Sequence, residues 1–135
     1  MAKILVVDDE HSICESLEMF LSEKGHTVHA AGSASEALSS CSRLKPDVVI
    51  LDIRLPDRSG MEVLEILNTT PTPPKIIMIT AFHDMETTIQ AMKTGAYDYI
   101  HKPLDADEIE SAVDRALNVL KEDREAVIQD VPEES

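Results

Sequence analysis

The sequence lacks the residues and segments that mark several common protein classes. It has no Trp and only four Phe and Tyr residues in 135, so a folded core must be aliphatic. No apolar stretch approaches the roughly 20 residues that a membrane-spanning helix needs. The amino terminus lacks a basic region followed by a longer apolar one, which is the pattern of a secretory signal. We therefore expect a cytoplasmic protein with no membrane segment.

Basic residues are also scarce. The chain has 12 Lys and Arg against 26 Asp and Glu, which gives a formal net charge of -14. Binding to a phosphate backbone depends on Lys and Arg that replace its counterions, and no cluster of them is present. The composition predicts that this chain makes no direct contact with nucleic acid.

Metal sites based on Cys and His are not indicated. Cys14 and Cys41 have no Cys-x-x-Cys spacing and lie on different predicted helices. We interpret them as small buried apolar residues rather than as a disulfide or a metal site. The five His residues have no spacing typical of zinc ligands, so we expect surface or packing roles for them.

Four short apolar runs, rich in β-branched residues, each end at a polar residue. Their length and near-continuous apolar character predict strands that are covered on both faces, as in a parallel sheet. The carboxyl ends of such strands form the usual ligand-binding edge. The runs are 4–7 before Asp8 and Asp9, 48–51 before Asp52, 76–79 before Thr80, and 97–100 shortly before Lys102.

Segments with helical periodicity alternate with these strands along the whole chain. Strand followed by helix, repeated, predicts an α/β fold with a doubly wound parallel sheet. A further strand at 26–31 is inferred from this alternation alone. Ser33 with Glu36, and Asp105 with Glu108, have capping-box spacing and predict helices that begin near 34 and 106. Gly25 and Gly95 are expected to close the first and fourth helices.

The length and the 43% of hydrophobic residues fit one compact domain. We place it at residues 1–121 and interpret 122–135 as an acidic tail or linker. An alternative is that Leu117, Leu120, Val127 and Ile128 extend the last helix toward a dimer partner or an output domain after Ser135.

The polar strand ends have a consistent chemistry. Asp8, Asp9 and Asp52 repel one another unless a hard cation neutralises them, and Mg2+ prefers such oxygen ligands. Asp52 is held at the end of a central strand, where a carboxylate can act as a nucleophile toward phosphorus. Lys102 and Thr80 supply an ammonium and a hydroxyl for phosphoryl oxygens.

Together these residues resemble the receiver domain of two-component response regulators, over residues 3 to about 120. The motifs that carry the resemblance are Asp8-Asp9, Asp52, Thr80-Ala81, Tyr99 and Lys102-Pro103. The family fold it implies is flavodoxin-like, with five strands in the order 2-1-3-4-5 flanked by five helices. Residues 80–99 are similar to receivers that regulate AAA+ transcription activators. Arg54 and Phe82 differ from many receivers and would affect solvent access and the lifetime of the phosphorylated state.

The resemblance also implies a role for each site residue. Asp52 would be the phosphoacceptor, with Lys102 and Thr80 as its catalytic partners. Mg2+ would be bound by Asp9, Asp52 and the backbone carbonyl of Arg54, with Asp8 acting through a metal-bound water. The phosphoryl group would be held by Thr80, the Ala81 amide and Lys102, and Tyr99 would respond to Thr80 as the aromatic switch.

The implied function is a phosphorylation-dependent signalling switch rather than an enzyme that acts on other molecules. A sensor histidine kinase or a phosphotransfer protein would donate the phosphoryl group, and the domain would assist its own phosphorylation and dephosphorylation. The output would be a changed surface on the fourth helix, fifth strand and fifth helix, through which a homodimer would form.

Three other interpretations of the same strand ends are possible. A haloacid-dehalogenase-like phosphatase needs a second Asp two residues after the nucleophile, where this chain has Arg54. A flavodoxin-like cofactor binder needs a Gly-rich phosphate loop, which follows none of the predicted strands. A phosphorylation-independent interaction module on the same fold stays open, because a fold does not dictate chemistry.

Overall fold

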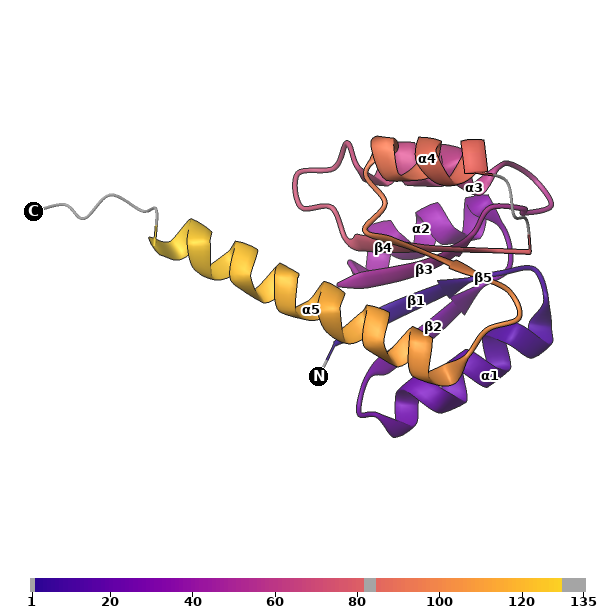
Figure 1. Cartoon of the computed structure of the whole chain (residues 1–135), viewed down its shortest axis with the longest axis horizontal. Coiled ribbons are helices and arrows are strands. Elements are labelled where there is room, and N and C mark those ends of the chain that lie inside the picture. The colour runs from indigo at the N-terminus through magenta and orange to yellow at the C-terminus, as the bar shows by residue number, and fades with distance from the viewer. Residues whose placement is uncertain (1, 82–84, 130–135) are drawn as a thin grey trace, which may run out of the picture.

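The computed structural model of the chain describes residues 2–81 and 85–129, and of 125–129 only the helical backbone. One five-stranded parallel sheet in the order β2-β1-β3-β4-β5 lies between two layers of helices (Figure 1). The predicted doubly wound fold and strand order are confirmed. The elements are β1 (Lys3–Val7), α1 (His11–Glu23), β2 (Thr27–Ala31), α2 (Ala34–Leu44), β3 (Val48–Asp52), α3 (Gly60–Leu67), β4 (Lys75–Thr80), α4 (Met85–Thr94), β5 (Asp98–His101) and α5 (Ala106–Gln129).

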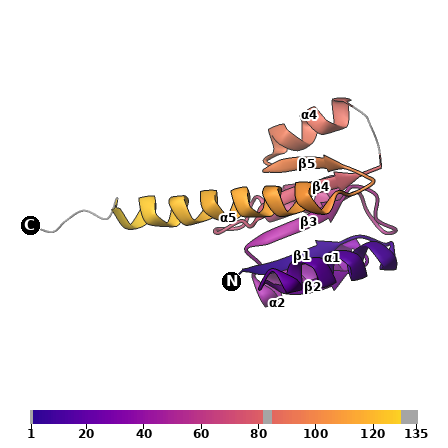
Figure 2. The same ribbon diagram turned by 60° about the horizontal axis from the view of Figure 1, so that its bottom comes forward.

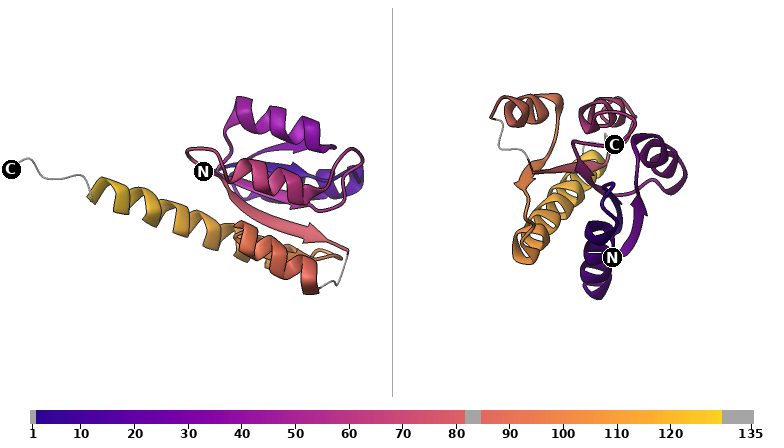
Figure 3. Two further views of the ribbon diagram at one scale, coloured as in Figure 1. Left: turned by 90° about the horizontal axis from the view of Figure 1, so that it is seen from above. Right: turned by 90° about the vertical axis from the view of Figure 1, so that its right-hand side faces the viewer.

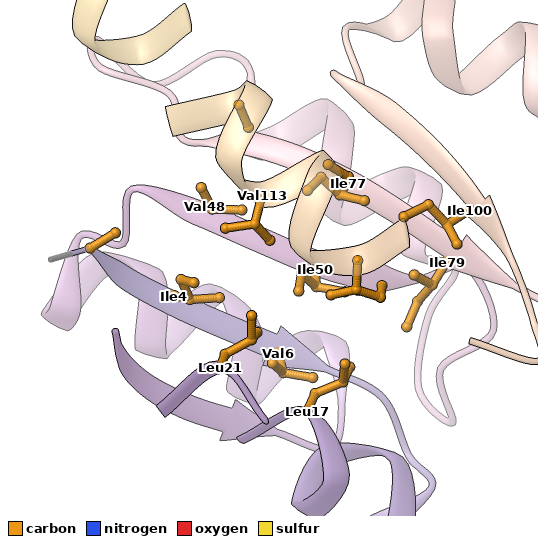
Figure 4. Close-up of a cluster of buried hydrophobic side chains, with 14 of the residues drawn as sticks. Ile4, Val6, Leu17, Leu21, Val48, Ile50, Ile77, Ile79, Ile100 and Val113 are labelled. Atoms are coloured by element: carbon orange, nitrogen blue, oxygen red, sulfur yellow. The ribbon is translucent and has the colours of Figure 1, made fainter. Parts of the chain in front are cut away.

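The two helical layers cover opposite faces of the sheet. Helices α1 and α5 lie on one face, and α2, α3 and α4 lie on the other (Figures 1 and 3). Side chains that alternate along a strand point to opposite faces, so Ile4 and Val6 pack toward α1 and α5 while Leu5 and Val7 pack toward α2 and α3. Figure 4 shows the first of these two aliphatic cores. Because both faces are buried, every residue of β3 is buried, as its near-continuous apolar run predicted.

The helix ends agree with the predicted positions, with differences in detail. The Ser33 side chain accepts the Glu36 N–H at 3.1 Å, while the Glu36 carboxylate accepts from Gly32 rather than from Ser33 itself. Asp105 accepts from the N–H of Asp107, one residue earlier than a capping box requires. Gly25 and Gly95 follow α1 and α4 at φ values of 93° and 116°, which only Gly adopts readily.

Helix α4 forms where predicted, but its spacing of apolar residues does not mark its buried face. Ile89 and Met92 are 47% and 45% exposed, and the buried residue is Ala91, with Thr87 and Thr88 half-buried beside it. The small and β-branched side chains pack closely on the sheet, which leaves the larger apolar ones on the surface.

Helix α5 extends past residue 121, where the domain is expected to end. It runs to Gln129, so residues 122–129 of the expected tail are helical. Its last turns reach past the sheet (Figure 2). Two ion pairs connect this part of α5 to the amino edge of the sheet: Arg124 to Asp47 at 2.9 Å and Asp123 to Lys75 at 3.0 Å. Across the described ranges, no helix is both long enough and apolar enough to span a membrane.

Candidate functional site

The register of the sheet brings the predicted site residues together. Val7 pairs with Leu51, so Asp8 and Asp52 follow at adjacent positions of β1 and β3. Thr80 ends β4 opposite His101, which places Lys102 one residue beyond Thr80. A pocket at this edge is lined by Asp9, Glu10, Asp52, Arg54, Thr80, Ala81 and Lys102.

Three carboxylates form a cluster that fits a hard cation. Asp8, Asp9 and Asp52 each offer an oxygen, and these atoms lie within 4.8 Å of one another. Asp8 and Asp52 are only 1% and 5% exposed, whereas Asp9 is open to solvent. Mg2+ prefers oxygen donors and retains several waters when bound, so a carboxylate cluster with one side open to solvent suits it. The ion would also relieve the repulsion between the carboxylates.

The ammonium of Lys102 faces this cluster. Its Nζ lies 2.8 Å from Asp8 Oδ2, 3.2 Å from Asp52 Oδ2 and 3.4 Å from Glu10 Oε1. Burial by itself would lower the pKa of Lys102, but Asp8 and Asp52 outweigh burial and raise it above its ordinary value. The side chain of Lys102 is therefore positively charged at neutral pH. The Lys102-Pro103 peptide bond, which precedes α5, is cis.

Asp52 is held in a defined orientation. Its Oδ1 accepts the Arg54 N–H at 3.2 Å and its Oδ2 accepts from Lys102. Burial, followed by the charge of Asp8, raises the pKa of Asp52, while Lys102 and the Arg54 amide partly oppose that rise. Any further cation in the pocket would favour the ionised carboxylate, which is the nucleophilic form.

The loop from β3 to α3 is tightly folded around Asp52. Arg54 and Ser59 pair across it, and the Gly60 N–H donates to the Ile53 carbonyl at 2.6 Å. A Cβ at Gly60 would lie within 2.1 Å of the Asp52 carbonyl oxygen, so only Gly allows α3 to begin there. Nothing in the local sequence predicted that Asp57, at the exposed tip, would bind α2 through its carboxylate.

Tyr99 lies on the same face of the sheet as Thr80. It pairs with Met78, two residues before Thr80 on β4, and packs against the core beneath α2, α3 and α4. Its ring contacts His101 edge-on at 5.2 Å. Its hydroxyl oxygen is buried and has no hydrogen-bond partner among the described residues. Phe82, expected to flank the pocket, lies outside those residues.

Two residues were not anticipated, Glu10 in the pocket and Asp57 in the loop beside it. Glu10 reaches Lys102 from the start of α1, 92 positions away, and Asp57 reaches α2 from the loop after β3. Apolar strand ends could not reveal either residue, because neither directly follows a strand. The other predicted residues are all brought to the pocket or its floor, with Tyr99 on the adjacent strand.

Comparison with known proteins agrees with this geometry. Residues 4–114 match the model of the response regulator receiver domain. The regulatory protein AtoC of Escherichia coli is 36% identical over 87% of this chain, and the transcriptional regulatory protein ZraR of the same organism is 40% identical over 84%. The crystal structure of the signal receiver domain of a putative LuxO repressor from Vibrio parahaemolyticus superposes with a TM-score of 0.88 at 26% identity, covering 93% of this chain and 96% of that one.

The relatives AtoC and ZraR are much longer than this chain. This chain spans about a quarter of AtoC and ZraR, 25% and 26% of their respective lengths. The family match, by contrast, covers most of the present chain and includes all of the pocket residues. The chain belongs to the response regulator receiver domain family.

Proposed function

We propose that this receiver domain is a phosphorylation-dependent signalling switch whose phosphoacceptor is Asp52. The observation that carries the proposal is the position of Asp52: a nearly buried carboxylate, on the pocket floor, between a lysine at 3.2 Å and two further carboxylates. A lone buried acid would be a poor nucleophile, but this one is oriented by two hydrogen bonds and lies beside groups suited to a phosphoryl group.

The proposed reaction transfers a phosphoryl group from a phosphohistidine. An Asp52 carboxylate oxygen forms a bond to phosphorus as the phosphorus–nitrogen bond breaks, and the electron pair stays on the imidazole, which takes up a proton. Lys102 and the Thr80 hydroxyl stabilise the negative charge on the phosphoryl oxygens, together with the Ala81 amide. Attack by water on phosphorus then releases phosphate and regenerates the Asp52 carboxylate.

Magnesium is the proposed cofactor. Asp9, Asp52 and the Arg54 carbonyl would hold it, with Asp8 interacting through a bound water. When bound, the ion neutralises carboxylate and phosphoryl charge during transfer. The acidic cluster supports this assignment because its three carboxylates offer oxygen atoms that lie within 4.8 Å of one another.

The proposed output is a change at the surface formed by α4, β5 and α5. Binding of the phosphoryl group by Thr80 would draw the end of β4 toward the pocket, and Tyr99, on the same face of the sheet, would move in response. The half-buried ring and its unpartnered hydroxyl, among the described residues, support a side chain with more than one packing position.

We also propose a place for the chain in a larger system. A sensor histidine kinase or phosphotransfer protein in the cytoplasm would be the donor. The similarity to AtoC and ZraR supports control of a transcription activator of the AAA+ kind. Residues 1–121 would form the phosphoacceptor domain, and 122–135 would lead to the output domain.

The test is phosphorylation by acetyl phosphate in the presence of magnesium, followed by intact-mass measurement. We expect the wild type to gain the mass of one phosphoryl group and Asp52→Asn to gain none. Asp114→Asn, an exposed acid on α5, is the matched control and should react as the wild type does. A wild type that gains no mass would favour the phosphorylation-independent interaction module, and a reactive Asp52→Asn would show that another residue is the acceptor.

A further inference from the structure

The Asp57 carboxylate joins two segments that are distant in sequence. Its Oδ1 accepts the Ala34 N–H at 2.8 Å and its Oδ2 accepts the Ser35 N–H at 2.9 Å. Both amides belong to the first turn of α2, where an N–H group has no acceptor within the helix. The hydrogen bonds from Ser35 and then Ala34 lower the pKa of Asp57 to about 2. The carboxylate is ionised at neutral pH, so both bonds are charge-assisted.

Helix α2 already has a cap of its own. The Ser33 hydroxyl accepts the Glu36 N–H at 3.1 Å, which is the usual local arrangement. Asp57 is therefore a second cap, supplied by another loop. Asp57 lies at the exposed tip of that loop, where Pro56 and Arg58 also face solvent.

The base of the same loop contains Arg54. Its N–H donates to Asp52 Oδ1 at 3.2 Å, and it pairs with Ser59 across the loop. The Arg54 peptide therefore lies between the phosphoacceptor carboxylate and the tip that Asp57 fixes. A movement of the tip would be passed to this peptide through the two intervening residues, Leu55 and Pro56, and through the Arg54–Ser59 pair.

We propose that Asp57 is a positioning residue: it anchors the loop after β3 to the amino end of α2 and so keeps the Arg54 peptide in place for the metal site. The inference rests on the proposed function, because it assigns that peptide to magnesium binding. Asp57 itself touches neither the metal site nor the phosphoryl site. It acts through the loop.

The alternative is that Asp57 only stabilises α2, and a pair of variants separates the two roles. Asp57→Ala removes the long-range cap and Ser33→Ala removes the local one, so both disturb the first turn of α2. Only Asp57→Ala should change the loop. Asp57→Asn keeps one acceptor oxygen and should give an intermediate result.

The first measurement is amide hydrogen exchange on the full chain without magnesium. We expect the amides of Ala34, Ser35 and Arg54 to exchange faster in Asp57→Ala, and the Glu36 amide to exchange faster in Ser33→Ala with Arg54 unchanged. The second measurement is magnesium affinity, which should fall about tenfold in Asp57→Ala, as for other residues that orient metal ligands, and stay at the wild-type value in Ser33→Ala.

The outcomes are distinguishable from failure of the proposed function. A wild type that binds no magnesium refutes the proposed metal site, and Arg54 exchange then still decides whether Asp57 holds the loop. A wild type that binds magnesium, together with Asp57→Ala of equal affinity or unchanged Arg54 exchange, overturns the positioning role alone. An equal loss of affinity in Ser33→Ala would assign the effect to α2 and overturn it as well.

Discussion

At the scale of residues, charge decides how the pocket behaves. The carboxylates of Asp8, Glu10 and Asp52 lie within 3.4 Å of the Lys102 ammonium, and Asp9 joins Asp8 and Asp52 in the acidic cluster. The two buried acids are paired with the lysine, and Asp9 is the exposed member of the cluster. The folded protein therefore tolerates a repulsion that a bound cation would relieve, so metal binding and stability should be coupled.

Asp9→Asn tests that coupling. We expect the metal-free variant to melt a few degrees above the wild type, because two unit charges about 4 Å apart repel by about 1 kcal/mol even in water. Magnesium at 100 times its dissociation constant should add about 2.7 kcal/mol to the free energy of unfolding of the wild type and so raise its melting temperature. It should have little effect on the variant. Calorimetric melting with and without magnesium measures both.

The control for this prediction is Asp114→Asn, which removes one negative charge from the exposed side of α5. Its response to magnesium should match that of the wild type. An Asp9→Asn protein with an undiminished magnesium response would place the ion elsewhere.

Which residues could be predicted from the sequence follows from how each reaches the pocket. Asp8, Asp52 and Thr80 directly follow or end apolar strands, so strand prediction alone locates them. Glu10 and Asp57 could not be found in that way, because their partners lie 92 and 22 to 23 positions away. The tertiary fold creates those contacts, and no local pattern reports them.

At the scale of elements, the same contrast appears between the strands and the outer helices. The inner strands β1, β3 and β4 were predictable because burial on both faces demands continuous apolar sequence, whereas the partly exposed β2 was inferred only from the alternation of elements. The buried face of α4 was not predictable, since Ala91 carries little apolar signal and the larger Ile89 and Met92 face outward. The sequence likewise left open whether α5 continues beyond residue 121, where Arg124 and Asp123 pair with residues before β3 and at the start of β4.

Arg124→Ala should loosen that far end of α5 without unfolding the domain. The Arg124–Asp47 pair is exposed, so we expect a loss of stability of at most about 1 kcal/mol. Amide exchange over 117–124 should accelerate, and the difference from the wild type should shrink in high salt because salt screens the pair.

Arg115→Ala is the matched control, because Arg115 pairs with Asp98 nearer the start of the helix. It should leave exchange over 121–124 unchanged. Equal protection of those amides in Arg124→Ala and the wild type would mean that apolar packing, not the ion pairs, holds the end of α5.

At the scale of the whole molecule, the two faces of the sheet present different surfaces. Helix α4 exposes Met85, Ile89 and Met92 on one side, whereas α1 exposes Met19 on the other. The proposed output surface of α4, β5 and α5 includes the first set. A symmetric dimer through that surface would bury these apolar side chains.

We expect phosphorylation to promote this dimer. Sedimentation with and without beryllofluoride, which mimics the acyl phosphate, should show a shift from monomer to dimer in the wild type. Ile89→Glu should prevent the shift by placing a charge in the apolar interface. Met19→Glu, at a position that is 67% exposed on α1, is the control and should dimerise normally.

A protein that stays monomeric in both states would contradict the dimer and favour a heterologous partner for the same surface. A wild type that dimerises, with Ile89→Glu dimerising equally well, would place the contact on another face.

Helix α5 leads the chain away from the pocket. The helix starts three residues after Pro103, beside the pocket, and its last turns extend past the opposite end of the sheet (Figure 1). Its 24 residues correspond to about 36 Å. A fluorescent label or a fusion partner attached after Gln129 would therefore leave the approach to Asp52 unobstructed. A donor protein could then bind at the pocket while the label reports from the opposite end of the molecule.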